Sequence, residues 1–562
     1  MQIKLFFTLF LITYAFAASS QVEVEGHRLA QFTINNNNYG SQQATLNLKL
    51  ASIDSILAIN EDTRVKGNRY VALAKFEELT RDKIVELVDI QSVGGIIIIV
   101  PKNTENLSKE VLIEMQNVEK YLVSRSFSSS IYFIYDEKDV DSIYQQIVNK
   151  NSFSNSFSAL GDFRNNKKAL VSSPYQTIQS MIYADVENHD NLPILVISAN
   201  YDSFAVAPSL AMNTLDNASG TIGVLELNRL FSKLYQNTGK KGIYLFLFIF
   251  IIFYFICLLF ILYIYTITYN ILFVLTNGGM MDNEGLRQWL IQTNPELLNN
   301  ILFALSLDRL GLHDSLHLHI NKFPKEEDLQ RLLSTFEVVG KQMNMPVTVD
   351  VKNVNLEHSH RTYMHERFAM RRIPSGTITS ITEEEEQTQG DAYMRGSLFN
   401  NKVDMELYIK SIKVIAESLA KYMLNVESAG NIFEGPLTLN TDSITNWMNI
   451  FSKTSTYAPF ITIDSPLIKA LKQYLSSYAD DVQVIKSTVD MKDNAQFFGD
   501  HSGTIQLYQY KSPFYDVYVN ISLIIGCILF YGFIVYLTRG KKALQFEIHQ
   551  VYESIFGSEK EN

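Results

Sequence analysis

The sequence predicts an α/β protein with a doubly wound sheet, helices on both of its faces, a smaller α/β region before it and one membrane-spanning helix after it. Between residues 159 and 429, short apolar strand patterns alternate with helical patterns, which is typical of such a sheet. Near the end of the chain, residues 517–538 are uncharged and long enough to span a bilayer. The 562 residues suffice for two or three domains with sizeable cores.

The first 17 residues are predicted to be a cleaved signal peptide. Lys4 is the charged start, residues 5–14 are apolar, and Ala15-Phe16-Ala17 has the small-residue pattern of a cleavage site. An uncleaved anchor is the alternative, although the apolar part is short for one. We therefore expect the rest of the chain to enter the lumen of the secretory pathway.

Residues 18–150 are expected to form an N-terminal lumenal α/β region. Residues 94–101 and 130–135 are apolar enough for buried strands, and residues 109–122 have a helical pattern. Asn106 begins a glycosylation sequon on a polar stretch and is the expected glycosylation site. A second sequon at Asn217 lies where we expect burial.

Residues 159–429 carry the main sheet, and residues 432–515 form a C-terminal lumenal region that we expect to brace it against the membrane. The expected strands are 168–172, 180–186, 194–197, 270–275, 301–307, 317–320 and 347–351. The expected helices are 220–234, 406–424, 443–453 and 466–478.

An apolar insert at residues 242–268 does not fit this pattern. As a second membrane span it would have Lys240 and Lys241 on its lumenal side, against the positive-inside rule. From residue 243 onward it contains Ile, Phe, Leu and Tyr almost alone, which is typical of a translated intron in an A/T-rich genome. Without the insert, a helix, a polar turn and a strand follow one another as in an ordinary α/β crossover. A retained intron is our interpretation, and a real second span is the alternative.

The charges around the C-terminal span set its orientation. Asp516 precedes it and Arg539, Lys541 and Lys542 follow it, so residues 539–562 are expected to be a cytosolic tail. The protein is then a type I membrane protein with most of its chain in the lumen. The net charge of −11 and the lack of a basic stripe argue against nucleic acid as a partner.

One loop resembles part of a metal site. The string Ser198-Ala199-Asn200-Tyr201-Asp202-Ser203 follows an apolar strand and holds Asn200 where a zinc hydrolase would hold a histidine. Asp216 follows about fifteen residues later and opens a helix. The spacing is that of a metal site, but the ligand set is incomplete.

These segments, with residues 273–290, 305–311 and 365–374, resemble the zinc-aminopeptidase-like fold. The strings at 201–208 and 365–372 are more closely similar to the nicalin family, membrane-anchored and catalytically degenerate relatives of these peptidases that are related to nicastrin. The resemblance covers most of the chain outside the insert. Active relatives bind two zinc ions through two His, two Asp and a Glu, and use a second Glu as general base. By resemblance, the metal-site positions fall on Asn200, Asp216, Asp308 and His365, with Asp202 as the orienting carboxylate.

The Glu pair of the active family would fall at residues 277–279, where there is no carboxylate. Each metal would keep only two protein ligands and the base would be missing, whereas a catalytic zinc generally needs three ligands. We therefore expect no enzymatic activity and no cofactor. Glu284 moving into the site is the remaining way to supply a base.

The resemblance implies a non-catalytic lumenal scaffold of the endoplasmic reticulum membrane. Its implied partners are a Nodal-modulator-type lumenal protein, a small multi-pass membrane protein and the translocon, in a complex that assists insertion and maturation of multi-pass membrane proteins or assembly of receptors. Two alternatives stay open: an active lumenal metallopeptidase with an atypical metal site, and a nicastrin-like substrate receptor of a protease complex.

Overall fold

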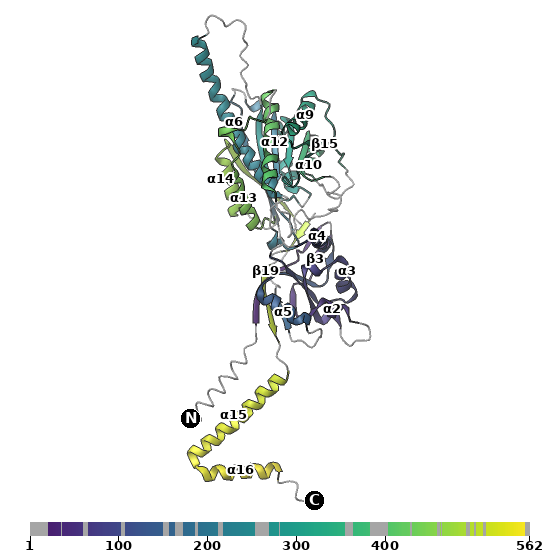
Figure 1. Ribbon diagram of the computed structural model, residues 1–562, viewed down its shortest axis with the longest axis vertical. Coiled ribbons are helices and arrows are strands. Elements are labelled where there is room, and N and C mark those ends of the chain that lie inside the picture. The colour runs from purple at the N-terminus through teal and green to yellow at the C-terminus, as the bar shows by residue number, and fades with distance from the viewer. Residues whose placement is uncertain are drawn as a thin grey trace.

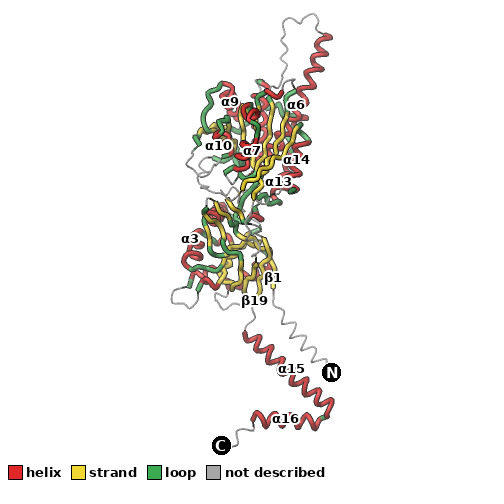
Figure 2. The backbone as a smooth tube through the Cα atoms, turned by 180° about the vertical axis from the view of Figure 1, so that it is seen from behind, coloured by secondary structure: helices red, strands yellow, loops and turns green. Residues whose placement is uncertain are grey.

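The structure is a computed structural model that places two folded units end to end, with the C-terminal helices beyond the first unit (Figures 1 and 2). It describes residues 21–34, 36–59, 66–102, 107–149, 157–162, 172–185, 189–211, 217–252, 269–279, 282–354, 363–382, 403–426, 430–457, 461, 464–490, 495–498, 502–509 and 513–556. The expected signal peptide, Asn106 and Asp216 lie outside the described residues, as does the part of the insert from 253 to 268.

The first unit is a closed barrel built from distant parts of the chain. In order around the barrel its strands are β1 (Gln21–Arg28), β19 (Ser502–Gln509), β9 (Phe157–Asp162), β4 (Thr45–Ser52), β5 (Tyr70–Lys75), β6 (Gly95–Val100) and β8 (Ser130–Tyr135). A separate four-stranded sheet consists of β18 (Ala495–Phe497), β2 (Phe32–Ile34), β3 (Asn37–Ser41) and β7 (Ser126–Phe127). The helical segments are α2 (Ile53–Leu57), α3 (Arg81–Val85), α4 (Lys109–Ser124) and α5 (Lys138–Asn149).

Strand β6 of the barrel is apolar along its whole length because both of its faces are covered. Ile97 and Ile99 belong to one core cluster, whereas Ile96 and Ile98 belong to another on the opposite side of the strand. Successive side chains of a strand point to opposite faces, so a strand covered on both faces is apolar throughout. The predictions of β6, β8 and α4 agree with the structure.

The second unit contains an eight-stranded sheet. Its order is β15 (Val347–Val351), β14 (Leu316–Ile320), β16 (Ser375–Thr379), β13 (Ile301–Leu307), β11 (Ile194–Asn200), β12 (Asn270–Thr276), β10 (Ser172–Ile182) and β17 (Asp481–Asp490). The four central strands β16, β13, β11 and β12 are parallel, so their carboxyl ends meet at one edge. Strands β10 and β12 pair antiparallel, as do β14 and β16.

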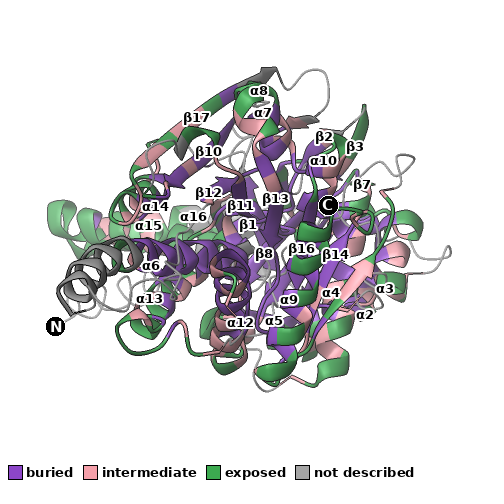
Figure 3. Ribbon diagram, turned by 90° about the horizontal axis from the view of Figure 1, so that it is seen from above, coloured by how far each residue is buried: buried purple, intermediate pink, exposed green. Residues whose placement is uncertain are grey.

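Helices cover both faces of this sheet, which confirms the predicted fold class. One core cluster joins α6 (Asn217–Ile252), α9 (Glu327–Gln342), α12 (Met405–Leu424), α13 (Thr441–Lys453) and α14 (Pro466–Ser476) to one side of the central strands. Another joins α7 (Glu284–Gln292) and α10 (Met364–Met370) to the other side, near α8 (Pro295–Asn299). In Figure 3 the central strands β11, β12 and β13 are buried and the outer sides of the helices are exposed.

Several strands were not expected from the sequence, among them β16, β17 and β19. Strand β16 is fully buried in the middle of the sheet, although it is rich in Ser, Thr and Gly. Strand β17 extends the sheet and β19 closes the barrel, so residues 432–515 contribute to both units. The C-terminal part of the chain therefore ties the two units together before it reaches the last helices.

The apolar insert enters at the edge of the sheet remote from the carboxyl ends of the central strands. Helix α6 follows β11 and continues to Ile252, and its last part projects beyond the folded unit (Figure 1). Strand β12 starts at Asn270 and pairs in parallel with β11. The segment thus lies in the connection of an otherwise ordinary parallel crossover.

The chain ends in α15 (Pro513–Arg539) and α16 (Lys541–Phe556). Within the described residues, one helix is long and apolar enough to cross a membrane, over Asn520–Arg539. The described apolar side chains of α15 are mostly exposed, as expected for a helix whose surroundings are lipid. The expectation of one C-terminal apolar helix is confirmed.

Candidate functional site

The carboxyl edge of the central strands collects the predicted site residues. Asn200 ends β11, and Asp308 follows β13 directly. Ser198 is aligned with Ser306, which in turn is aligned with Thr377 of β16, so these strand ends lie at the same level. His365 on α10 contacts Thr377. This edge is where ligands commonly bind in open α/β sheets.

Asn200 is buried in a closed set of neutral hydrogen bonds. Its Oδ1 accepts a bond of 2.6 Å from the Thr276 hydroxyl, and its Nδ2 donates a bond of 2.8 Å to Oδ1 of Asn283. A Cβ placed on Gly279 would lie only 2.7 Å from Asn200 Nδ2, so the loop backbone packs directly on the amide. The amide is thus held by protein partners on both its oxygen and its nitrogen.

Asp202 is fully buried and holds the same loop from its other side. The backbone N–H of Gly279 donates to both carboxylate oxygens, at 3.2 and 3.1 Å. Gly278 has a φ of +80°, and Asn283 adopts the left-handed region as well, at +52°. The Gly-rich segment at 277–279 can therefore approach Asp202 with its backbone, where a chain with a carboxylate pair would present side chains.

Glu284 is fixed away from the role of a general base. The Arg287 guanidinium donates to both of its carboxylate oxygens at 2.6 Å, and Gln288 donates a third bond of 2.6 Å. Asp282 next to it pairs with Arg367 of α10, whose Nε also donates to the Asp282 carbonyl at 2.7 Å. These bonds anchor the start of α7 to α10.

Asp308 is paired with the adjacent arginine. Nε of Arg309 lies 3.4 Å from Oδ2 of Asp308, and both side chains are nearly buried. Arg309 has a φ of +45°, which is unfavourable for a residue with a long side chain. Its carbonyl accepts bonds from the hydroxyl and the backbone N–H of Ser380, at 2.6 and 3.1 Å, and these bonds hold the conformation.

His365 lies at the end of a row of stacked rings. Its ring is 5.6 Å from that of Tyr363, which is 4.6 Å from His319. Nδ1 of His365 is hydrogen-bonded to the Thr377 hydroxyl at 2.9 Å. Burial, with a smaller contribution from His319, lowers the pKa of His365 to about 3, so the ring is neutral at physiological pH.

His317 and His319 have a structural partner in the neighbouring strand. Nδ1 of His317 is 3.0 Å from Oδ2 of Asp350, and Nδ1 of His319 is 3.8 Å from the same atom. Among the described residues, no group of three or more His, Cys, Asp and Glu side chains has the arrangement of a metal site.

The residues described at this edge do not fit a catalytic zinc centre. The Asn200 amide is held by Thr276 and Asn283, and a guanidinium stands beside Asp308, where it opposes a second cation. His365 has a neutral ring whose Nδ1 is bonded to the Thr377 hydroxyl. Asn200 and Asp308 already have protein partners, and we derive no reaction step through a metal.

The loop after Asp202 has a role that the sequence did not reveal. Phe204 belongs to the core cluster of the barrel unit and packs edge-to-face on Phe32, with ring centroids 5.6 Å apart. The Ala30 N–H donates to the Val206 carbonyl at 2.8 Å. The segment that leaves the candidate site thus enters the other unit. The apolar string 204–208 was the available signal for this contact.

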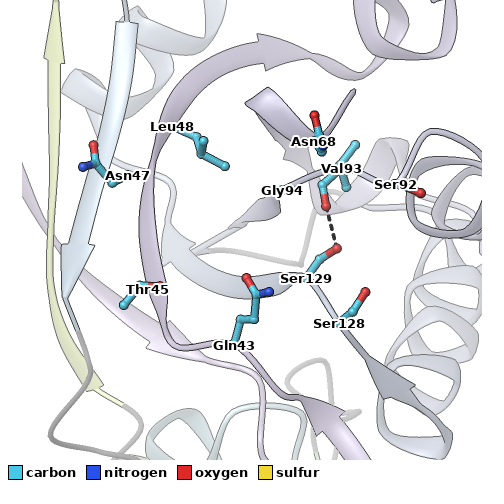
Figure 4. Close-up of a pocket in the computed structure, with 10 residues that line it drawn as sticks. All are labelled: Gln43, Thr45, Asn47, Leu48, Asn68, Ser92, Val93, Gly94, Ser128 and Ser129. Atoms are coloured by element: carbon cyan, nitrogen blue, oxygen red, sulfur yellow. Dashed lines mark hydrogen bonds between the residues drawn. The ribbon is translucent and has the colours of Figure 1, made fainter. Parts of the chain in front are cut away.

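A polar cavity of about 400 Å³ lies in the barrel unit, away from the carboxyl edge of the sheet. Figure 4 shows its uncharged lining, where the Ser129 hydroxyl donates to the Val93 carbonyl at 2.6 Å. The lining residues are Gln43, Thr45, Asn47, Leu48, Asn68, Ser92, Val93, Gly94, Ser128 and Ser129. Because the lining has no acid, base or nucleophilic pair, it offers no group for catalysis.

The chain is similar along most of its length to several curated proteins. BOS complex subunit ncln of Danio rerio is 27% identical over 557 residues, which cover 92% of this chain and 90% of that protein. BOS complex subunit NCLN of Homo sapiens is 26% identical and covers 90% and 88%, respectively. A Caenorhabditis elegans protein named Nicalin is 20% identical and covers 76% and 75%. The resemblance to nicalin is confirmed. No family model matches the chain.

Among solved structures, the γ-secretase component nicastrin has a similar fold. The match has a TM-score of 0.57 and 9% identity and covers 86% of this chain and 99% of that chain. A zinc aminopeptidase from Bacillus subtilis matches with a TM-score of 0.33 at 12% identity, which is too low to add to the argument. The likeness to nicastrin shows the fold.

Proposed function

We propose that this protein is a non-catalytic scaffold subunit of a membrane complex, with a peptidase-like lumenal domain that has lost its metal site. The observation that carries the proposal is the use of the site residues as structural groups. Asn200 and Asp202 hold the loop at Gly279, and Asp308 is neutralised by Arg309. In this reading Asn200, Asp202, Asp216, Asp308 and His365 are the degenerate positions of a former metal site.

The relatives support the kind of complex. They are named as subunits of the BOS complex, and they match this chain over about nine-tenths of its length. We infer that this chain assembles in the endoplasmic reticulum membrane with a Nodal-modulator-type lumenal protein and a small multi-pass membrane protein. The complex would lie beside the translocon and assist multi-pass proteins during insertion, maturation or receptor assembly.

The topology belongs to the same proposal. Residues 1–17 are removed as a signal peptide, Asn106 is glycosylated, and residues 539–562 lie in the cytosol. Helix α15 then anchors the two lumenal units, and the one described helix that is long and apolar enough to cross a membrane supports this arrangement.

Co-purification of the full chain tests the proposal. The tagged protein, solubilised in a mild detergent, is compared with His365→Gln, a change that alters the former metal position and preserves the size and polarity of the site. We expect both proteins to recover the same two partners and the translocon in equal amounts.

Two results would count against the scaffold role. Recovery of a presenilin-type protease in place of these partners would favour a nicastrin-like receptor. Recovery of bound peptide substrates with His365→Gln, but not with the unchanged protein, would favour a peptidase.

A further inference from the structure

The last helix starts one residue after the membrane-spanning helix. Helix α15 ends at Arg539 and α16 begins at Lys541, with Gly540 between them at a φ of +81°. Glycine adopts this conformation without steric cost, which allows the chain to turn sharply. A single residue spans less than about 4 Å, so the start of α16 is fixed at the level where α15 leaves the apolar layer.

The turn between the two helices is packed, so the first turns of α16 lie against the last turns of α15. A Cβ on Gly532 would lie 3.5 Å from Cδ1 of Leu544. Val535 is buried although most apolar side chains of α15 are exposed, and Arg539 is paired with Glu547 at 3.3 Å. Gly532 precedes Arg539 by seven residues, or about 10 Å along a helix. Leu544 therefore packs against the last two turns of α15, near the end that Arg539 marks.

One side of α16 is apolar and open. Leu544, Ile548 and Tyr552 follow each other at intervals of four residues and so lie on the same side of the helix. Ile548 and Tyr552 are each 61% exposed. Gln550 and the exposed Phe546 lie on the opposite side, as their positions in the helical repeat require.

Basic residues gather at the same level. Arg539, Lys541 and Lys542 surround the turn, and all three are exposed. Basic side chains beside a membrane surface are attracted to anionic headgroups. The apolar side and the basic end thus fit two layers of one bilayer surface.

We infer that α16 is an interfacial helix that lies on the cytosolic leaflet, with Leu544, Ile548 and Tyr552 at the acyl boundary and its basic end against anionic headgroups. The inference rests on the membrane topology proposed above. The packed turn then transmits the orientation of α16 to α15, which fixes the rotation and depth of the anchor relative to the lumenal units.

Depth measurement on the full chain tests this. Single nitroxide labels are placed by Ile548→Cys, Tyr552→Cys, Phe546→Cys, Gln550→Cys and Leu529→Cys in a Cys257→Ser, Cys527→Ser background. The purified chains are reconstituted in vesicles of phosphatidylcholine and phosphatidylserine, and paramagnetic resonance compares collisions with oxygen and with a water-soluble nickel chelate.

The oxygen-to-nickel ratio is expected to be several-fold higher at 548 and 552 than at the matched positions 546 and 550, and highest at 529. In vesicles without phosphatidylserine, the ratio at 548 should fall several-fold. Equal ratios at all four positions of α16 would overturn the inference. If position 529 is open to nickel, the span itself fails, and with it the anchoring in the proposed function. If 529 is protected but 548 and 552 are open, only the interfacial helix fails.

Discussion

The two halves of the carboxyl edge, where we propose a former metal site, hold their polar groups in different ways. Around Asn200 the place is closed by neutral groups, with the Gly279 backbone packed on the amide. Around Asp308 the ionisable groups persist, but each has a protein partner: Arg309 for the carboxylate and Thr377 for His365. In the first half, protein atoms fill the space around Asn200. In the second half, the charge of Arg309 compensates the charge of Asp308. This difference predicts that substitutions in the two halves will have different physical signatures.

The charge-compensated half should give the largest effect. Arg309→Ala leaves the Asp308 carboxylate nearly buried beside a missing cation, and we expect a loss of about 3 kcal/mol in the free energy of unfolding. Urea unfolding of the purified full chain, followed by fluorescence, measures this. Asp308→Asn combined with Arg309→Ala should cost less than Arg309→Ala alone. Equal losses in the single and double variants would show that charge is not the cause.

The volume-filled half should respond to added atoms. Gly279→Ala puts a Cβ 2.7 Å from Nδ2 and 2.9 Å from Cγ of Asn200, and we expect a loss of about 2 kcal/mol from overpacking. Gly279→Ala in an Asn200→Ala background is the control, because the crowded amide is then absent and the added Cβ should cost less. The same denaturation measurement applies. An equal loss in the two backgrounds would mean that the loop does not press on the Asn200 amide.

His365 should give the second half a pH signature. Its folded-state pKa of about 3 is below the ordinary value of 6.5, so the unfolded state binds the proton first on acidification. The stability due to the neutral ring is complete above pH 6.5 and is lost as the pH falls toward 3, by about 1.4 kcal/mol per pH unit for one proton. The free energy of unfolding of His365→Gln, measured between pH 6.5 and 4.5, should depend less steeply on pH than that of the unchanged protein. The same pH dependence in both proteins would mean that burial does not lower the pKa of His365.

The insert should give the smallest effect on either half. Residues 242–268 enter at the opposite edge of the sheet, so their deletion should leave the Tm unchanged or raise it. The effects of Arg309→Ala and Gly279→Ala on stability should be the same with and without the insert. Thermal unfolding of the deletion variant measures this. Sequencing the mature transcript across the junction tests the intron interpretation directly: a message that encodes all of 242–268 would refute it.

Some strands were predictable because they are covered on both faces and are therefore apolar throughout. Strand β6 of the barrel and strand β13 of the sheet are examples, and their boundaries were found almost to the residue. Strand β16 escaped notice because Ser375, Gly376 and Thr377 carry little apolar signal; its burial comes from its neighbours β13 and β14. The barrel escaped for another reason: β1 pairs with β19 across nearly the whole chain, and no local pattern encodes that pairing.

At the site, the family resemblance named Asn200, Asp308 and His365, and the structure places these three residues at one edge of the sheet. The sequence did not predict what holds each of them. That Gly279 would bind Asp202 through its backbone, or that Arg309 would adopt a positive φ, depends on the loop conformation. The loop at Phe204 packs into the other unit for the same kind of non-local reason.

The zinc content of the full chain tests the central claim most directly. The protein is purified in detergent, incubated with zinc, dialysed and measured by plasma mass spectrometry beside Asp308→Asn and His365→Gln. We predict far less than one zinc per chain and no difference among the three proteins. About one tightly held zinc per chain, lost in both variants together with peptide cleavage, would show that the site is an active metal centre.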